Sequence, residues 1–219
     1  MNLKNSGRYC VPTDEDFEPD SNNEVLKNYL GIKTSEEMGA LEEQELKRTE
    51  LELLKIFDEN HQFTADDICN IHELWLGDVY PSAGKYRTVT MSKDGFPFAA
   101  PPHIESSMKE FEKKYLAIHT PCHYSDLDEL ALALGTVHIE LILIHPFREG
   151  NGRTARLLAD LMATQSNKPP LNFSAIDKTE NEKGFDQYIL AIHAGVRGDY
   201  KPIQEIFNKL LKLDYLAVL

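Results

Sequence analysis

The sequence predicts a mostly α-helical domain that contains one β-hairpin. Apolar residues recur at three- and four-residue intervals over most of the 219 residues, which is the period of an amphipathic helix. One stretch, residues 86–98, changes to the two-residue alternation of a strand pair. Hydrophobic residues make up 42% of the chain and charged residues 27%, which is ordinary for a chain that buries a core. We therefore expect one large domain, residues 34–219, preceded by an N-terminal arm.

Residues 1–33 are predicted to form this arm and one short helix. Residues 1–22 carry two prolines and an acidic cluster at 14–18, with little apolar periodicity. We expect the cluster to be solvated and the arm to be partly docked through Val11 and Phe17. The short helix is expected over residues 23–30.

Capping signals followed by helical apolar spacing predict the main helices. Thr34 and Thr64 each precede two acidic residues in a first turn, which favours a helix start. In the helix that follows Thr34, we expect the C-terminal half to be the better buried, because its apolar residues are denser. The predicted helices cover residues 35–57, 65–79, 104–119, 127–144, 153–165, 181–194 and 201–213.

The hairpin is predicted from a turn between two extended segments. Residues 86–91 alternate and are rich in β-branched side chains, and residues 96–98 extend again. The Asp94-Gly95 pair between them is a strong hairpin signal. Pro97 has no N–H to donate, so the second strand should lie at a sheet edge with one side unpaired.

Charge and cysteine content exclude several classes of protein. The net charge of −13 argues against a nucleic-acid partner, since binding the phosphate backbone needs a basic surface. The three cysteines, Cys10, Cys69 and Cys122, are scattered and odd in number, so a disulfide framework is not expected. No apolar leader or run of about 18 apolar residues occurs, so neither secretion nor membrane insertion is expected. We expect a cytoplasmic protein.

Residues 145–156, with the sequence HPFREGNGRTAR, form the motif around which the chain is organised. The apolar run 141–144 precedes them and a helical pattern, 157–162, follows. A buried helix thus delivers a histidine, the chain turns through two glycines, and a new helix begins. The start of a helix after a glycine-rich turn presents free N–H groups and the positive end of the helix dipole, which favours an anion.

The residue types of the motif indicate phosphate chemistry. His145 is the candidate general base, because its charge changes near neutral pH. The main-chain N–H groups of Gly150, Asn151 and Gly152 can point towards a phosphate. Glycine has no side chain, so it allows the phosphate to approach the backbone closely. Glu149 could hold Mg²⁺, a hard cation that takes carboxylate and phosphate oxygens together.

Three arginines, Arg148, Arg153 and Arg156, form a local positive cluster in an acidic chain, which suits a small anionic ligand. Arg153 and Arg156 lie three residues apart, hence on one helix face, and their planar forks suit phosphate oxygens. The Walker phosphate-binding pattern does not apply, because its lysine is absent and no strand precedes the loop.

At these residues the sequence resembles the Fic (filamentation induced by cAMP) family, whose signature is His-Pro-Phe-x-(Asp/Glu)-Gly-Asn-Gly-Arg-x-x-Arg. Residues 145–156 match every fixed position. The resemblance covers roughly residues 70–205, and segments between Gly77 and Thr88 look like those before the family's β-hairpin, called the flap. Residues 86–98 would be this flap, which in the family docks a target polypeptide by strand addition.

The resemblance implies transfer of AMP from ATP to a Tyr, Ser or Thr hydroxyl of a target protein, with pyrophosphate leaving. His145 would take the proton from the attacking hydroxyl, and Glu149 would bind Mg²⁺ bridging the α- and β-phosphates. Asn151, with the backbone around Gly150 and Gly152, would form the anion hole for the α-phosphate.

The remaining motif positions receive roles in the same way. Arg153 and Arg156 would hold the β- and γ-phosphates, Arg148 would add to the nucleotide site, and Phe147 would point into the core and fix the loop. The implied target-docking residues are Thr88, Val89, Thr90, Met91, Ser92, Lys93, Asp94, Gly95 and Phe96.

Two alternatives stand beside adenylyl transfer. A protein of this fold could move another phosphate-linked group, such as phosphocholine, phosphate or UMP. Doc-like kinases of the family replace the Gly and Arg after Asn, whereas this chain keeps Gly152 and Arg153, which favours nucleotidyl transfer. The other alternative, a nucleotide-binding regulatory module without turnover, is disfavoured by the intact His145.

Control of the activity is expected to come from outside the chain. Many relatives carry an inhibitory helix with the pattern Ser/Thr-x-x-x-Glu-Gly/Asn, whose glutamate pairs with the second motif arginine. Three partial matches occur, ending at Glu110, Glu129 and Glu140, but Phe or Leu follows each of them. We therefore expect an inhibitor protein, if one exists, to act in trans on Arg156. We expect a bacterial protein, which could also be delivered to a host cell.

Overall fold

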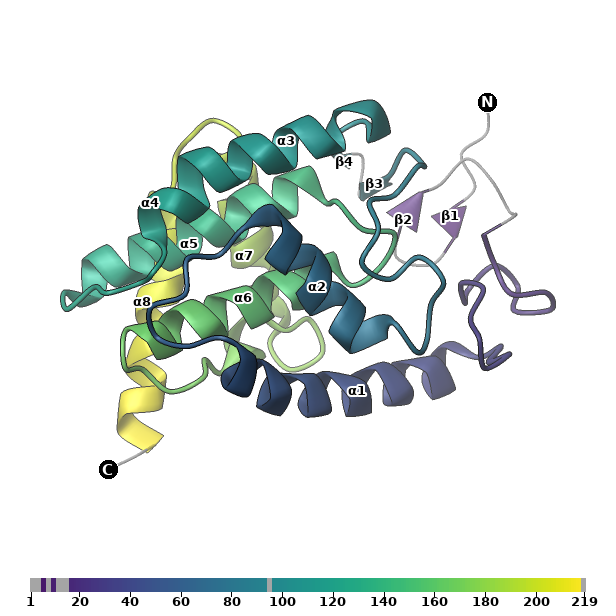
Figure 1. The fold of residues 1–219 in the computed structure, drawn as a ribbon, viewed down its shortest axis with the longest axis horizontal. Coiled ribbons are helices and arrows are strands. Elements are labelled where there is room, and N and C mark those ends of the chain that lie inside the picture. The colour runs from purple at the N-terminus through teal and green to yellow at the C-terminus, as the bar shows by residue number, and fades with distance from the viewer. Residues whose placement is uncertain (1–4, 7–8, 11–15, 94–95, 218–219) are drawn as a thin grey trace. The chain divides into compact units, whose positions relative to one another are not determined.

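The computed structural model describes residues 5–6, 9–10, 16–93 and 96–217, and Figure 1 shows the order of their helices and strands. The mostly α-helical fold with a β-hairpin is confirmed. The helices are α1 Ser35–Ile56, α2 Ala65–Leu76, α3 Ile104–Phe111, α4 Ala117–His119, α5 Leu127–Ile144, α6 Asn151–Gln165, α7 Glu182–Gly195 and α8 Lys201–Ala217. A π-helical segment, Glu112–Leu116, joins α3 to α4.

Capping side chains set the helix starts as the sequence predicts. The Thr34 hydroxyl accepts a hydrogen bond from the Glu37 N–H at 3.4 Å where α1 begins. Asp126 accepts from the N–H groups of Asp128 and Glu129 at 2.9 and 3.0 Å at the start of α5. These bonds satisfy N–H groups that have no partner within the helix.

The contacts of the chain gather into two compact units. Unit 1 comprises residues 1–55, 65–109 and 144–151, and unit 2 comprises residues 56–64, 110–143 and 152–219. The division falls inside the motif, so its first half belongs to unit 1 and the rest of α6 to unit 2.

The core of unit 1 gathers around Trp75 and Tyr80. Both reach a buried glutamate of α1: the Trp75 indole N–H donates to the Glu42 carbonyl at 2.9 Å, and the Tyr80 hydroxyl donates to its carboxylate at 2.6 Å. The α1 face that packs inwards carries Met38, Glu42, Thr49 and Leu53.

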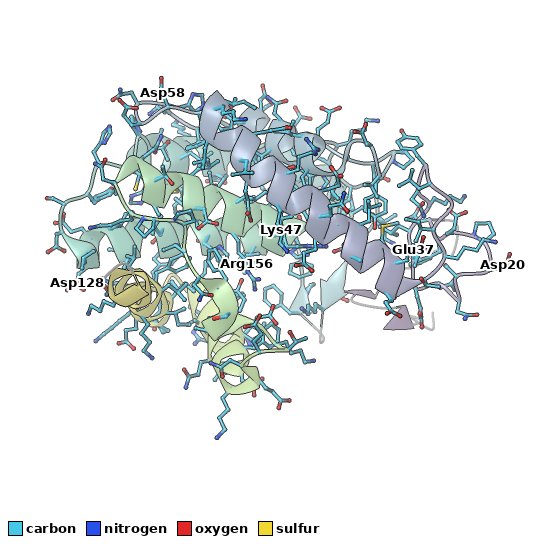
Figure 2. The ribbon with its side chains drawn as sticks, turned by 90° about the horizontal axis from the view of Figure 1, so that it is seen from below. Asp20, Glu37, Lys47, Asp58, Asp128 and Arg156 are labelled. Carbon is cyan, nitrogen blue, oxygen red and sulfur yellow. The ribbon has the colours of Figure 1, made fainter. Side chains whose placement is uncertain are left out.

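The C-terminal half of α1 is not the better buried half, so that prediction is wrong. Leu51, Leu54 and Ile56 are exposed, because they lie off the face that packs inwards. Figure 2 labels two further positions on this helix, Glu37 and Lys47, both exposed.

The short helix predicted over residues 23–30 is also wrong. Phe17 pairs with Leu26 in an antiparallel bridge, and the Glu18 N–H donates to the Val25 carbonyl at 2.8 Å. The intervening turn places Asp20, Asn22 and Asn23 at positive φ, which Asp and Asn tolerate and a helix does not. Docking of the arm through Phe17 is confirmed, since this side chain is buried in the core of unit 1, and Val11 lies outside the described residues.

The hairpin lies in a four-stranded antiparallel sheet with the order β1-β2-β3-β4. In β3 and β4, Ser92 pairs with Pro97 and Lys93 with Phe96, and β4 is the last strand of the described sheet, as Pro97 predicts. The strand predicted over residues 86–91 does not form. The missed strands are β1 and β2, from the arm, and β2 pairs with β3 at Cys10 and Ser92. The strands are β1 Asn5–Ser6, β2 Tyr9–Cys10, β3 Ser92–Lys93 and β4 Phe96–Pro97.

Unit 2 is built around α5, whose last residues, 141–144, are all apolar, as expected of a buried helix. Leu130, Leu134 and Leu141 are fully buried along it. Close packing requires a glycine on α7, because a Cβ at Gly195 would lie 2.5 Å from the Ile139 side chain. In the described part of the chain, no helix is both long enough and apolar enough to cross a membrane.

Candidate active site

His145 follows α5 directly and has a left-handed backbone, with φ of +53°. This conformation costs a non-glycine residue roughly 1–2 kcal/mol, so its surroundings must hold it. The imidazole is buried and stacks on the Phe98 ring, with 3.7 Å between ring centroids and 8° between planes. The His145 carbonyl accepts a hydrogen bond from the Arg87 guanidinium at 2.7 Å. The candidate base is thus fixed through both its ring and its main chain.

The loop after His145 is anchored by Phe147, which is fully buried as predicted. Its ring stacks on His72 of α2 with 3.9 Å between centroids. His72 Nδ1 accepts from the Gly84 N–H at 2.9 Å, so its Nε2 carries the proton and donates to the Glu149 carbonyl at 3.0 Å. Sequence reasoning missed His72, and the available signal was a histidine beside the apolar face of α2.

Asn151 closes the same loop as the first residue of α6. Its side-chain oxygen accepts from the Phe147 N–H and its amide donates to the Phe147 carbonyl, both at 2.8 Å. The side chain is buried. Asn151 therefore shapes the loop that leads into the helix N-terminus.

The two motif glycines are required for different reasons. Gly150 has φ of +78°, and a Cβ there would lie 2.7 Å from the Trp75 ring, so both conformation and packing demand glycine. A Cβ at Gly152 would meet no atom within 4 Å, and its φ is not in the left-handed region. The space at Gly152 lies in the first turn of α6, where free N–H groups and the helix dipole favour an anion.

Glu149 offers the motif's only carboxylate. One of its oxygens accepts from the Gly150 N–H at 2.9 Å. Among the described residues, no group of three or more His, Cys, Asp or Glu side chains could hold a metal ion. The single carboxylate of Glu149 fits Mg²⁺, which is usually bound by one or two carboxylates together with phosphate oxygens and water.

Arg148 is held by the N-terminal arm. Its Nε lies 3.3 Å from a carboxylate oxygen of Asp16, and its guanidinium lies over the Phe17 ring, 5.4 Å from the centroid. Asp16, which belongs to the acidic cluster predicted to be solvated, keeps 38% of its side chain exposed but pairs with this buried arginine. Asp14 and Glu15 lie outside the described residues. Arg148 Nη2 is buried with no hydrogen-bond partner among the described residues. A nucleotide-binding role for Arg148 stays a prediction.

Arg153 and Arg156 lie on α6, as predicted, and Figure 2 labels Arg156. Arg156 lies over the Phe173 ring at 5.4 Å from its centroid, and its Nη1 is 4.0 Å from Asp177. Its Nε is buried and makes no hydrogen bond to the described residues. A guanidinium N–H such as that of Arg156 Nε can donate a hydrogen bond to an anion.

The predicted docking residues differ in exposure. Thr88 and Thr90 are exposed, whereas Met91 is fully buried in the core of unit 1, so its side chain cannot contact a docked polypeptide. The remaining described positions are partly exposed: Val89, Ser92, Lys93 and Phe96. Asp94 and Gly95 lie outside the described residues.

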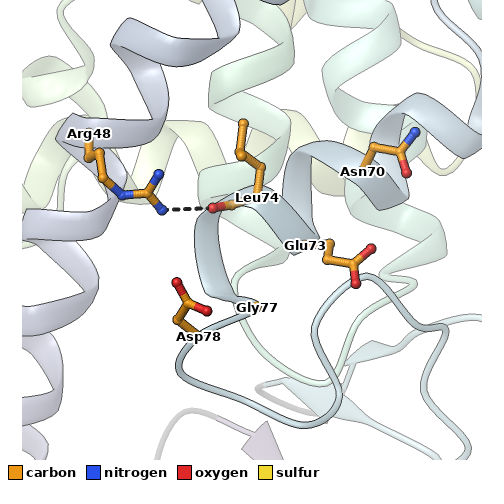
Figure 3. Close-up of a pocket in the computed structure, with 6 residues that line it drawn as sticks. All are labelled: Arg48, Asn70, Glu73, Leu74, Gly77 and Asp78. Atoms are coloured by element: carbon orange, nitrogen blue, oxygen red, sulfur yellow. Dashed lines mark hydrogen bonds between the residues drawn. The ribbon is translucent and has the colours of Figure 1, made fainter.

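Unit 1 also has a surface hollow of about 490 Å³ between α1 and α2, shown in Figure 3. Arg48 is its only cationic lining residue, and its guanidinium is already held by Glu45, Glu52 and the Leu74 carbonyl. No motif residue lines this hollow, so we do not assign it to the nucleotide. Its lining residues are Arg48, Asn70, Glu73, Leu74, Gly77 and Asp78.

Comparison with known proteins agrees with the motif. Residues 62–163 match the family model described as Fic/DOC family. Protein adenylyltransferase fic-1 of Caenorhabditis briggsae is 31% identical over 145 residues, which are 66% of this chain and 26% of that protein. Protein adenylyltransferase VbhT of Bartonella schoenbuchensis is 35% identical over 139 residues, which are 60% of this chain and 27% of that protein. The chain thus spans about a quarter of the length of these two relatives.

The fold is also found among solved structures. The BepC protein of Bartonella tribocorum, a VirB-translocated effector with bound AMPPNP, aligns with a TM-score of 0.67 at 23% sequence identity. The alignment covers 85% of this chain and 92% of that chain. At this identity the likeness establishes the fold alone.

Proposed function

Since the chain belongs to the Fic/DOC family through residues 62–163, we propose that it is a protein adenylyltransferase that transfers AMP from ATP to a hydroxyl group of a target protein. The observation that carries this proposal is the complete motif on a helix–loop–helix segment, with His145 held at the loop's start and α6 beginning at Asn151. The names of the two relatives support the same reaction.

In the proposed reaction, the target hydroxyl oxygen attacks the α-phosphorus of ATP. A bond forms between them, the bond from the α-phosphorus to the bridging oxygen breaks, and pyrophosphate leaves. His145 accepts the hydroxyl proton as general base. Most of the catalysis in such a transfer is positioning together with neutralisation of phosphate charge.

The charge of the phosphates would be met from three sources. The backbone N–H groups around Gly150 and Gly152 supply the anion hole, and Arg153 and Arg156 bind the β- and γ-phosphates. Glu149 would hold Mg²⁺, which would supply positive charge to neutralise the phosphates.

The partners in this proposal are a target protein and an inhibitor. The target would add an extended segment to the β3–β4 hairpin, either beside β4 or in place of β2. The inhibitor would present an anionic group to Arg156 in trans and so compete with the ATP phosphates.

Labelled ATP tests the reaction. The purified chain is incubated with Mg²⁺, host-cell lysate and ATP labelled at the α- or the γ-phosphate, beside the His145→Ala variant. Adenylyl transfer predicts α-label on protein that depends on His145. Label only from the γ-phosphate would identify a kinase, and no label from either would favour transfer of another group or a binding module.

A further inference from the structure

Arg87, which precedes the hairpin, is the most extensively bonded arginine side chain of unit 1 among its described residues. It is 4% exposed. Its guanidinium donates to the carbonyls of His145 at 2.7 Å, Val89 at 2.6 Å, Ala99 at 2.6 Å and Ile144 at 3.4 Å. Its main-chain N–H also donates to the Pro146 carbonyl at 2.8 Å.

The chemistry of these contacts favours positioning over stability. All the acceptors are main-chain carbonyls, whereas a buried cation is best stabilised by a carboxylate. Burial, with a smaller contribution from the Arg148 charge, lowers the pKa of Arg87 to about 10, so the side chain stays protonated at neutral pH. What the guanidinium supplies is a rigid planar fork that fixes the directions of several bonds at once.

These bonds join two parts of unit 1. Val89 and Ala99 flank the hairpin on its two sides, and Ile144 and His145 form the end of α5 and the start of the motif loop. A second link runs beside the first, because Phe98, the neighbour of Ala99, stacks its ring on the His145 imidazole. These contacts therefore fix the position of His145 relative to the hairpin.

We propose that Arg87 is a positioning residue, which fixes the left-handed backbone and the imidazole of His145 relative to the hairpin on which the acceptor polypeptide docks. This inference rests on the proposed function, since it concerns the base of that reaction. Arg87 binds the carbonyl of His145 and the residues that flank the hairpin, and it is not assigned a contact with a phosphate. Its loss should therefore lower kcat and leave the KM for ATP unchanged.

The kinetic test compares Arg87→Ala, Arg87→Lys and a matched control, Arg48→Ala. A misplacement of the base by about 1 Å costs on the order of 10²-fold in rate, and this is the fall in kcat expected for Arg87→Ala. Guanidinium ion, added below denaturing concentration, should restore part of the rate of this variant. Arg87→Lys keeps the charge without the fork, so it should fold, stay slow and gain nothing from guanidinium.

A spectroscopic test separates this inference from the proposed function. The Phe98 ring current shifts the NMR signals of the stacked His145 ring, which His145→Ala assigns. In Arg87→Ala and Arg87→Lys these signals should move towards the positions of an unstacked histidine, whereas Arg48→Ala should leave them unchanged. Variants that are folded with wild-type His145 signals and wild-type kcat would overturn the role of Arg87. A wild-type chain that transfers no AMP would refute the proposed function, while the NMR comparison would still decide the inference.

Discussion

Two of the three buried histidines among the described residues, His138 in unit 2 and His145 in unit 1, are held in different ways. His138 engages both ring nitrogens within the core, one with the Tyr188 hydroxyl at 2.8 Å and one with the Ala155 carbonyl at 3.3 Å. Burial, and secondarily the Arg156 charge, lower the pKa of His138 to about 3. His145 is instead held by ring stacking and through its carbonyl, with a backbone that few residues adopt.

This difference separates a structural histidine from a candidate catalytic one. Burial is the main reason that the pKa of His138 is low, so its ring stays neutral near neutral pH, and its two contacts engage both ring nitrogens. At His145 the surrounding groups fix the position and the plane of the ring, which is what a general base requires. Buried histidines seven residues apart in one sequence are thus distinguished by their contacts and not by their burial.

The largest effect that tests this comparison is expected from His145→Ala. Removing a positioned general base lowers a rate by typically ~10²–10⁴-fold, and this is the expected fall in AMP transfer. ATP binding should survive, because the phosphates are assigned to α6 and its arginines. Transfer rate and ATP affinity are measured on the same preparation, and a variant with unchanged transfer would refute the assignment of His145 as base.

Gly150→Ala tests how firmly the loop after His145 is fixed. The positive φ and the 2.7 Å approach to Trp75 should together cost about 2–4 kcal/mol of the free energy of unfolding. Gly152→Ala is the matched control, because its Cβ would meet open space and alanine favours a helix.

Urea unfolding and ATP titration distinguish the two glycine variants. Gly152→Ala should be as stable as the wild type yet bind ATP more weakly, if a phosphate occupies the space beside it. Equal loss of stability in both variants would contradict the different reasons given for the two glycines.

Sequence pattern predicts those parts of the fold that have a local cause. The starts of α1 and α5 follow from capping side chains, whereas the burial of Phe147 was implied by the family resemblance. The apolar spacing along α1 did not predict which residues are buried, because burial depends on what packs against the helix. Glu42 is buried and Leu51 is exposed, since Trp75 and Tyr80 contact the face of α1 that carries Glu42. Residue types of the motif identified the candidate site, but not the groups that hold it.

Those groups act through the main chain, which explains why sequence reasoning missed them. Arg87 and His72 bind carbonyl and N–H groups of distant residues, and any residue type offers these groups. The pairing of β2 with β3 joins Cys10 to Ser92 through strands of two residues, which are too short to show a period. Contacts of this kind become visible only in the folded chain.

The pH dependence of stability provides a smaller test, directed at His138. An unfolded histidine takes up a proton as the pH falls through about 6.5, while folded His138 takes none until about pH 3. The unfolded state then binds more protons, so the stability of the wild type should fall between pH 6.5 and 3, by up to about 1.4 kcal/mol per pH unit.

His138→Gln, which does not titrate, isolates this contribution. Its stability is compared with that of the wild type by urea unfolding at pH 7 and pH 5. The variant should lose less stability than the wild type over this interval. If both proteins lose the same amount, His138 is not the buried neutral histidine described here.

The smallest effect is expected at the hairpin that frames His145, where β2 of the arm occupies one side of β3. Deleting residues 1–10 removes β1 and β2 and leaves the Asp16 contact to Arg148 in place. The backbone hydrogen bonds of such a short pairing contribute roughly 0.5–1.5 kcal/mol each, and a target strand that uses this side must displace them. The apparent KM for a target protein should therefore fall about tenfold after the deletion.

A second variant, with residues 1–10 replaced by a Gly/Ser segment of equal length, controls for chain length and should behave like the deletion. An unchanged KM in both would indicate that targets dock beside β4, whose outer side is free of other described strands.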